Sequence, residues 1–299
     1  MIRIGFDIGG SKLAAITLDA GGRELARVRQ DVPQSYAATL EAVGAVVASF
    51  ERAHGPAAAI GIAIPGMIGA DGALIRVVNL PWLEGRPLRT DLARALGKPV
   101  AIANDANCFA LSEAIDGAAA GASVVFGAVL GTGVGGAIVI ERKPLPGANA
   151  IAGEWGHNPL PETEAAAGPP VVCGCGRTGC IETWLNGAAL ARDYRNLAGR
   201  ESSGPEIARL AEQGDADARM ALGRYRRRLA AALAGIVNVL DPEVIVLGGG
   251  LSSIASLYTE VPKLWVPLVV APEPRTRLLP ARFGPESGLR GAAWLGHPS

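Results

Sequence analysis

The chain has 299 residues, of which 49% are apolar and 19% charged, a composition typical of a globular protein and not of a disordered or fibrous one. Its 28 acidic residues balance its 28 basic residues, so no overall charge draws it to nucleic acid or to a membrane surface. The chain shows neither a signal-peptide pattern nor a run near the roughly 18 apolar residues of a membrane-spanning helix, and we expect a reducing, cytoplasmic location.

The first expected element is an apolar strand at residues 2–8, which runs into the glycine turn GGSK at residues 9–12. A second strand follows at residues 13–18. The turn is not a P-loop, because its lysine follows the serine and no helix begins there. Its bare backbone amides and its serine hydroxyl suit phosphate oxygens. Asp7, at the end of the first strand, is placed to hold Mg2+ directly or through water.

A helix is expected at residues 35–54, and residues 57–66 predict a strand that runs into a turn. The segment PVAIANDAN then predicts a short buried strand that leads into another helix. Asp105 stands at that helix start, where a carboxylate is favourable as an N-cap. The alternative is a general base at the mouth of a cleft, flanked by the amide of Asn104, which suits a hydroxyl ligand.

A second glycine turn, LGTGVGG, lies at residues 130–136. Its glycines match the dinucleotide-binding spacing, but β-branched residues follow where that motif requires a helix, so we reject a Rossmann site. Strand, glycine turn and strand recur about 124 residues after the first such unit, which indicates a duplicated domain. A single hairpin of this kind is most simply a tight turn. The pair favours nucleotide binding.

Three of the four cysteines stand within CGCGRTGC, residues 173–180. In a reducing compartment such clusters are metal ligands or catalytic groups more often than disulfides, and a bridge across one intervening residue would be strained. The fourth cysteine, Cys108, lies among apolar residues of an expected helix, whereas His157 precedes the cluster by sixteen residues. A core histidine beside three ordinary thiols is the plainer alternative. We predict a closed structural zinc site with the ligands His157, Cys173, Cys175 and Cys180.

Towards the end of the chain, residues 215–242 predict a long helix. We expect its residues Arg224, Arg226, Arg227 and Arg228 to form a solvated face and not a nucleic-acid surface. The segment DPEVIVLGGGLS at residues 241–252 predicts a buried strand that ends in three glycines. Backbone without side chains at the carboxyl end of a strand is where ligands lie in α/β sheets.

These segments carry a family resemblance. FDIGGSK, IPG, ANDAN, LGTGVGG, GEWGH, CGCGRTGCIE and VIVLGGG occur in the order found in the ROK family (repressors, open reading frames and kinases), and SGLRGAAWLG resembles the C-terminal segment of that family. The resemblance covers nearly the whole chain. One departure is Ser11, where the family usually has threonine; the hydroxyl is retained.

The resemblance implies the fold and the site. The fold is α/β, a two-lobed actin/hexokinase (ribonuclease H-like) fold with duplicated βββαβα domains and an inserted zinc-binding loop. The small lobe would comprise residues 1–119 with a helical return at about 287–299, and the large lobe residues 120–286. The ATP-binding residues would be Asp7, Gly9, Gly10, Ser11, Lys12, Gly131, Thr132, Gly133, Gly248, Gly249 and Gly250. The sugar-binding residues would be Gly66, Asn79, Asn104, Asp105, Glu154, His157 and Glu182.

The expected activity is transfer of the ATP γ-phosphate to a sugar hydroxyl, with Asp105 as the base and with Mg2+ on the phosphates. In this scheme zinc fixes a wall of the sugar pocket without touching the phosphates. NLPWLEGRPL and GEWGHNPLP are most similar to fructokinases and mannokinases, so we predict fructose as the acceptor, with mannose or glucose as secondary acceptors. N-acetylglucosamine kinases are the alternative, because they share NDANCFALSEA and FDIGG. A homodimer is also implied.

Two other classes of protein fit the sequence less well. Sugar-responsive repressors of the family carry a helix-turn-helix domain ahead of the first glycine turn, for which the strand expected from Ile2 leaves no room. An ATPase clamp of the actin or chaperone type is disfavoured by the zinc motif and by the polar residues near it.

Overall fold

The computed structural model describes residues 1–69, 72–77, 79–161 and 171–296. The described chain divides into two compact units. The first comprises Met1–Gly121, Ile138–Ala152 and Pro285–Ser299, and the second comprises Ala122–Ala137 and Gly153–Gly284. The predicted lobe boundaries at residues 119 and 286 remain a proposal. Part of the predicted helical return, residues 297–299, lies outside the described residues, as does most of the loop before the cysteine cluster.

The first half of the chain forms a five-stranded sheet in the order β3-β2-β1-β4-β7. Strand β1 pairs antiparallel with β2 and parallel with β4, which in turn is parallel to β7. The elements up to the end of this half are β1 (Ile2–Ile8), β2 (Lys12–Leu18), β3 (Glu24–Asp31), α1 (Tyr36–His54), β4 (Ala57–Ile64), β5 (Gly66–Ile68), β6 (Leu74–Val77), α2 (Leu88–Leu96), β7 (Val100–Asn104) and α3 (Asp105–Ile115).

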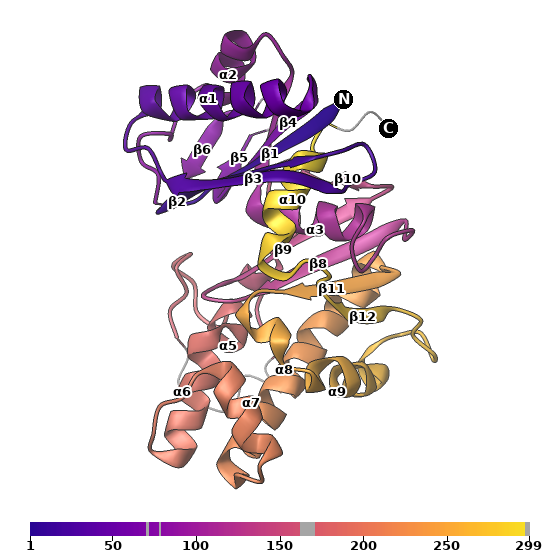
Figure 1. The fold of residues 1–299 in the computed structure, drawn as a ribbon. Helices are drawn as coiled ribbons and strands as arrows, with labels where there is room; N and C mark the ends of the chain where they lie inside the picture. The colour runs from indigo at the N-terminus through magenta and orange to yellow at the C-terminus, as the bar shows by residue number, and fades with distance from the viewer. Residues whose placement is uncertain (70–71, 78, 162–170, 297–299) are drawn as a thin grey trace. The chain divides into compact units, whose positions relative to one another are not determined.

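The second half repeats this plan with the sheet order β10-β9-β8-β11-β12, in which β8 is parallel to β11 and β11 to β12. The duplication and the α/β fold expected from the sequence are therefore confirmed (Figure 1). The remaining elements are β8 (Val124–Leu130), β9 (Val134–Ile140), β10 (Lys143–Pro144), η1 (Trp155–His157), α5 (Glu182–Leu185), α6 (Gly187–Ala198), α7 (Gly204–Glu212), α8 (Ala216–Leu240), β11 (Val244–Gly248), η2 (Gly250–Ser253), α9 (Ser256–Trp265), η3 (Val266–Leu268), β12 (Arg277–Pro280), η4 (Gly284–Glu286) and α10 (Ser287–Trp294).

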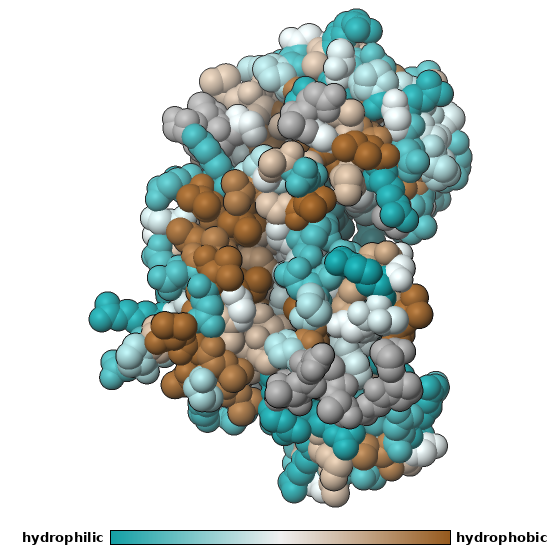
Figure 2. Space-filling view, turned by 180° about the vertical axis from the view of Figure 1, so that it is seen from behind, coloured by the Kyte–Doolittle hydropathy of each residue, from teal (hydrophilic) through white to brown (hydrophobic). Residues whose placement is uncertain are grey.

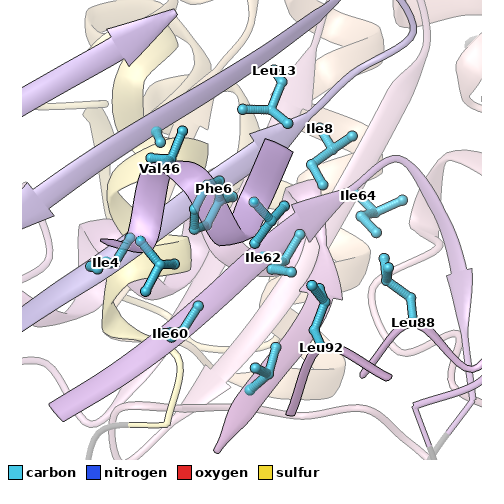
Figure 3. Packing of buried hydrophobic residues seen from close by; sticks show 14 of the residues in the cluster. Ile4, Phe6, Ile8, Leu13, Val46, Ile60, Ile62, Ile64, Leu88 and Leu92 are labelled. Carbon is cyan, nitrogen blue, oxygen red and sulfur yellow. The ribbon is translucent and has the colours of Figure 1, made fainter. Parts of the chain in front are cut away.

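Alternation along the strands gives the first sheet two different faces. One face packs its branched side chains against α1 and α2 in a single core (Figure 3). Its labelled members are Ile4, Phe6, Ile8, Leu13, Val46, Ile60, Ile62, Ile64, Leu88 and Leu92. The opposite face presents Gly5 beside Gly61, and α10 lies so close that a Cβ on Gly61 would come within 1.9 Å of the Ala292 carbonyl oxygen. Glycine is therefore required at both positions for α10 to pack against the sheet.

One expectation for the long helix α8 is wrong. Arg228 is not part of a solvated face; it is 2% exposed, forms an ion pair with Asp193 and stacks 4.8 Å from the ring of Trp184. A buried guanidinium of this kind needs a carboxylate partner, and the sequence does not reveal which acidic residue of another helix will supply it.

The surface mixes apolar and polar side chains (Figure 2). Among the large apolar side chains of the described residues, Val239 and Val270 are the most exposed, at 89% each. Within the described residues no helix combines the length and the apolar character required to cross a membrane.

Candidate active site

The first glycine turn closes a tight hairpin between β1 and β2. The backbone N–H of Gly9 donates to the Lys12 carbonyl oxygen at 2.9 Å, which leaves Gly10 and Ser11 exposed at the tip. The side chain of Asn79 lies against this tip, because a Cβ on Gly10 would come within 2.7 Å of the Asn79 Cβ. Asn79 itself has a positive φ of 63°, a conformation that asparagine tolerates better than most residues. The structure thus brings Asn79 to the predicted phosphate loop.

Asp7 and Asp105 come together at the carboxyl ends of the first sheet. Register places Asp7 level with Ala63 on β4, and Ala63 level with Ala103 on β7, two residues before Asp105. Burial, followed by the nearby carboxylates of Asp105 and Glu286, raises the pKa of Asp7 to about 6. Asp105 is exposed at the surface, but desolvation by the surrounding protein also raises its pKa. Two carboxylates this close together, Asp7 partly buried and Asp105 exposed, favour a bound cation or a proton, which fits a divalent ion at Asp7.

The start of α3 is capped by Asn104 and not by Asp105. Asn104 Oδ1 accepts the Ala106 N–H at 2.8 Å, while its Nδ2 donates to the Gly66 carbonyl oxygen at 2.9 Å. Asp105 is the first residue of the helix, and its Oδ1 accepts the same N–H at 2.9 Å. The N-cap alternative for Asp105 is therefore wrong. Asn104 supplies the cap and also links Gly66 to the residue that we consider the base.

The second glycine turn lies beside the triple glycine in the second unit. A Cβ on Gly249, whose φ is 81°, would come within 2.4 Å of the Leu130 carbonyl oxygen, so only glycine fits there. Thr132 stands exposed at the tip of the turn. Gly248 pairs with Val129 across parallel strands, so both turns lie at the carboxyl edge of one sheet, where ligands bind in α/β folds.

The predicted metal ligands form a compact cluster. One ligand atom from each of His157, Cys173, Cys175 and Cys180 lies within 4.8 Å of the other three. The Cys175 and Cys180 sulfurs are 3.7 Å apart, and His157 Nδ1 is 3.4 Å from Cys173 Sγ. Thiolates on a tetrahedral zinc ion with bonds of about 2.3 Å would be separated by about 3.8 Å. All four cysteines are free thiols, so a disulfide is excluded as the explanation of the cluster.

Charge and burial differ among the thiols. Hydrogen bonds from the backbone and side chain of Arg177 lower the pKa of Cys175 to about 6, while burial raises the pKa of Cys173 to about 12. A thiol such as Cys173 ionises readily only with a positive partner, which a divalent metal supplies. Cys108 is remote in sequence, fully buried in α3, and its pKa is raised well above the usual value by burial.

Trp155 anchors the segment that carries Glu154 and His157. Its ring packs edge-on against Phe126 at 5.7 Å, and its Nε1 donates to the Gly135 carbonyl oxygen at 2.7 Å. Glu154 Oε2 lies 3.8 Å from His157 Nε2, the ring nitrogen opposite the one that faces the cysteines. A metal-bound histidine commonly presents its second nitrogen to a carboxylate in this way.

Glu182 connects the cysteine cluster to the second glycine turn. Its Oε2 accepts the Val134 N–H at 3.0 Å, and its Oε1 accepts the Cys173 thiol at 3.4 Å. A Cβ on Gly133 would come within 2.6 Å of the same Oε2. Glu182 therefore links the cysteine cluster to the second glycine turn, and nothing in the local sequence pattern indicates this link.

The duplicated sheet, the paired glycine hairpins and the carboxylates at the strand ends are those of a sugar kinase with the actin/hexokinase fold. The chain belongs to the ROK family, whose sequence profile matches residues 3–298. It is 40% identical over 300 residues to the N-acetyl-D-glucosamine kinase of Salmonella paratyphi B (strain ATCC BAA-1250 / SPB7), an alignment that covers 97% of this chain and 98% of that protein. The enzyme of the same name from Escherichia coli O127:H6 is equally similar, at 40% over the same extents.

Solved structures agree with this assignment. The ROK hexokinase from Thermus thermophilus superposes with a TM-score of 0.83 at 34% identity, covering 98% of this chain and 97% of that one. A ROK family glucokinase from Streptomyces griseus, solved in complex with glucose and AMPPNP, has a TM-score of 0.76 at 30% identity and covers 99% of both chains. The sequence-based assignment to the family and to its fold is thereby confirmed.

Proposed function

We propose that the protein is an ATP-dependent N-acetylglucosamine kinase. The observation that carries this substrate is the 40% identity, over nearly the full length of both chains, to proteins that bear that name. The prediction of fructose as the main acceptor has no comparable support among these relatives, so fructose, mannose and glucose become the competing acceptors. The activity as a sugar kinase is common to both alternatives.

Asp105 acts as the general base in this proposal. It accepts the proton of the attacking sugar hydroxyl, whose oxygen bonds to the γ-phosphorus while ADP departs. Desolvation by the surrounding protein raises the pKa of Asp105, which makes its ionised form a better proton acceptor. Asn104 holds the start of α3 in place and so orients this carboxylate. Catalysis rests mainly on position and charge, because phosphoryl transfer asks little covalent chemistry of the protein.

The remaining proposed roles are distributed over the two units. In the first unit the sugar ligands are Gly66, Asn79, Asn104 and Asp105, and Asp7 holds the Mg2+ that accompanies ATP. In the second unit Glu154, His157 and Glu182 contact the sugar. The phosphates lie on the backbone amides of the two glycine turns, with the adenosine near Gly248–Gly250.

A zinc ion held by His157, Cys173, Cys175 and Cys180 would be structural, because four protein ligands leave no open position for Lewis-acid chemistry. The four side chains fit it, by donor type and by the separations given above. Cytoplasmic location and a homodimer remain predictions.

The test is sugar-dependent release of ADP from ATP and Mg2+, measured as kcat/KM for N-acetylglucosamine, fructose, glucose and mannose. We expect N-acetylglucosamine to have the highest value, by at least tenfold. A higher kcat/KM for fructose would instead support fructose as the main acceptor, as predicted from the sequence. No sugar-dependent release with any of the four would contradict the kinase assignment itself.

A further inference from the structure

Arg29 lies on the face of the first sheet that carries Asp7. Register places Asp7 of β1 level with Ala14 of β2, and Ala14 level with Arg29 of β3. Directly opposite residues of an antiparallel pair project from the same face of the sheet, with Cβ atoms about 5 Å apart. Two such steps separate the Cβ atoms of Asp7 and Arg29 by about 10 Å, with the methyl group of Ala14 between them.

The positive charge of Arg29 acts on the carboxylate of Asp7. Burial and the carboxylates of Asp105 and Glu286 raise the pKa of Asp7, and Arg29 is the cation that opposes them. Because the side chain of Ala14 ends at its Cβ, the longer side chain of Arg29 can extend over it towards Asp7. The sheet thus brings a guanidinium towards the carboxylate that we propose to hold Mg2+.

The charge of Arg29 is not used within the fold. Its side chain is exposed, and it forms no hydrogen bond or ion pair with the residues that the structure describes. Arg27, two residues earlier on the same face, differs, because it forms ion pairs with Glu24 at 2.8 Å and with Glu286. Of these two arginines, Arg29 is therefore the one that can bind a ligand without breaking an existing contact.

The proposed reaction defines which part of ATP lies nearest to this charge. The transferred phosphorus must be within reach of the base, Asp105, and of the Mg2+ that accompanies ATP at Asp7. The γ-phosphate is therefore the part of the nucleotide closest to Asp7. A guanidinium binds phosphate oxygens through parallel N–H donors in a planar fork, and it stays charged throughout the physiological pH range.

We propose that Arg29 binds the γ-phosphate of ATP and is a further catalytic residue of the kinase. The inference rests on the proposed kinase function, and it adds to the first glycine turn a cation from the neighbouring strand β3. ADP has no γ-phosphate, so Arg29 distinguishes ATP from ADP. The same guanidinium offsets negative charge on the phosphoryl group during its transfer to the sugar.

The experiment replaces Arg29 and compares binding of two nucleotides in the presence of Mg2+. In Arg29→Met, which keeps the bulk and removes the charge, we expect the Kd for the ATP analogue AMPPNP to rise about tenfold, the value of one contact to a charged group. The Kd for ADP and the KM for the sugar should stay unchanged, while kcat should fall by about tenfold or more. Arg29→Lys keeps the charge without the planar fork, so its Kd for AMPPNP should rise only about threefold.

Arg52→Met is the matched control, because Arg52 is an exposed arginine of α1, the helix that packs on the opposite face of the same sheet. It should change neither Kd nor kcat. A wild-type Kd for AMPPNP in Arg29→Met would overturn the proposal, and Arg29 would then be a charge that protects the edge strand β3 from pairing with another chain.

An equal rise in the Kd for AMPPNP and for ADP would also overturn the proposal, because it would place Arg29 in support of Asp7 and its Mg2+ and not on the γ-phosphate. If Arg29→Met does not fold, as judged by circular dichroism, Arg29→Gln and Arg29→Lys provide the same comparison. Failure of the kinase function is seen separately, as absence of sugar-dependent ADP release in the wild type. The two Kd values would still show whether Arg29 recognises the third phosphate group.

Discussion

The two glycine hairpins occupy equivalent places in duplicated sheets, but their supports differ. Behind the β1–β2 hairpin lie the carboxylates of Asp7, which is partly buried, and Asp105, which is exposed, and the pKa values of both are raised. The β8–β9 hairpin is held by hydrogen bonds, from the Val134 N–H to Glu182 and from Trp155 to the Gly135 carbonyl oxygen. The first arrangement is costly to the folded state without a cation, because it partly desolvates Asp7 and places it near a second negative charge, and the second arrangement stabilises that state.

This difference shows how a duplicated element can separate two tasks. The first copy carries the charged groups that the proposed chemistry requires, and its glycine tip is shaped by Asn79. The second copy is supported by Glu182, which follows the cysteine cluster in the chain and accepts the Val134 N–H of the hairpin. Removal of a supporting group should therefore lower stability in the second copy, whereas removal of a carboxylate in the first should lower activity.

The largest effect is expected from loss of a metal ligand in the second copy. Cys175→Ser should remove the ion and lower the free energy of unfolding by on the order of 5 kcal/mol or more, since binding of a structural zinc ion is part of the folding free energy. Metal analysis should find about one zinc ion per wild-type chain. Cys108→Ala, which changes a thiol outside the cluster, should retain the ion. Full zinc content and full stability in Cys175→Ser would exclude a zinc site with these four ligands.

In the first copy, Asp105→Ala should reduce kcat by about a thousandfold or more, as expected when a general base and its charge are both lost. Folding and zinc content should stay at wild-type levels. Asp105→Asn keeps the shape and the acceptor for the Ala106 N–H, so it should be as inactive and at least as stable. Turnover near that of the wild type in either variant would remove Asp105 from the role of base.

Asp7→Asn should separate stability from activity. The pKa of Asp7 is about 6 in the folded protein and 3.8 in the unfolded chain, so the folded state binds the proton more tightly. Its contribution to stability is therefore full below pH 3.8 and is lost as the pH rises through 6, which amounts to about 3 kcal/mol. At pH 7.5 without Mg2+, denaturant titration should find Asp7→Asn more stable than the wild type by up to this amount.

The same variant should lose most of its kinase activity, because the amide cannot replace a carboxylate as a Mg2+ ligand. At pH 4 the stabilities of variant and wild type should be closer than at pH 7.5. A variant that is less stable at pH 7.5, or one whose advantage is the same at both pH values, would contradict the raised pKa as the source of the difference.

The fold could be predicted because its signals are local. The strand at residues 2–8 and the long helix near residues 215–242 have clear periodicity, and β1 and α8 match them within two residues at each end. The metal cluster was also predictable, since CGCGRTGC confines three ligands to eight positions. His157 could be predicted as the fourth ligand because the chain has only three histidines.

Contacts between segments far apart in the chain could not be predicted in this way. The sequence does not indicate that Glu182 bonds to Val134, that Asn79 packs on Gly10, or that Arg228 is buried with Asp193. Each of these contacts depends on how separate elements pack. The identity of an acidic or amide residue does not indicate which residue it will contact. The cap of α3 could not be assigned from the sequence for a related reason, because Asn104 and Asp105 are both good caps and only the backbone conformation distinguishes them.

The smallest predicted effects concern Glu182, for which two roles can be separated by two substitutions. Glutamine can still accept the Val134 N–H with its carbonyl oxygen, but it loses one acceptor for a sugar hydroxyl. Glu182→Gln should therefore raise the KM for the sugar about tenfold, the value of one hydrogen bond to a charged group, and leave the KM for ATP unchanged. Glu182→Ala should raise both KM values, because the hairpin loses its support.

Glu212→Gln, at an exposed glutamate of the same unit, is the control. If Glu182→Gln leaves the sugar KM unchanged while Glu182→Ala raises the KM for ATP, Glu182 supports the phosphate loop and does not bind the sugar.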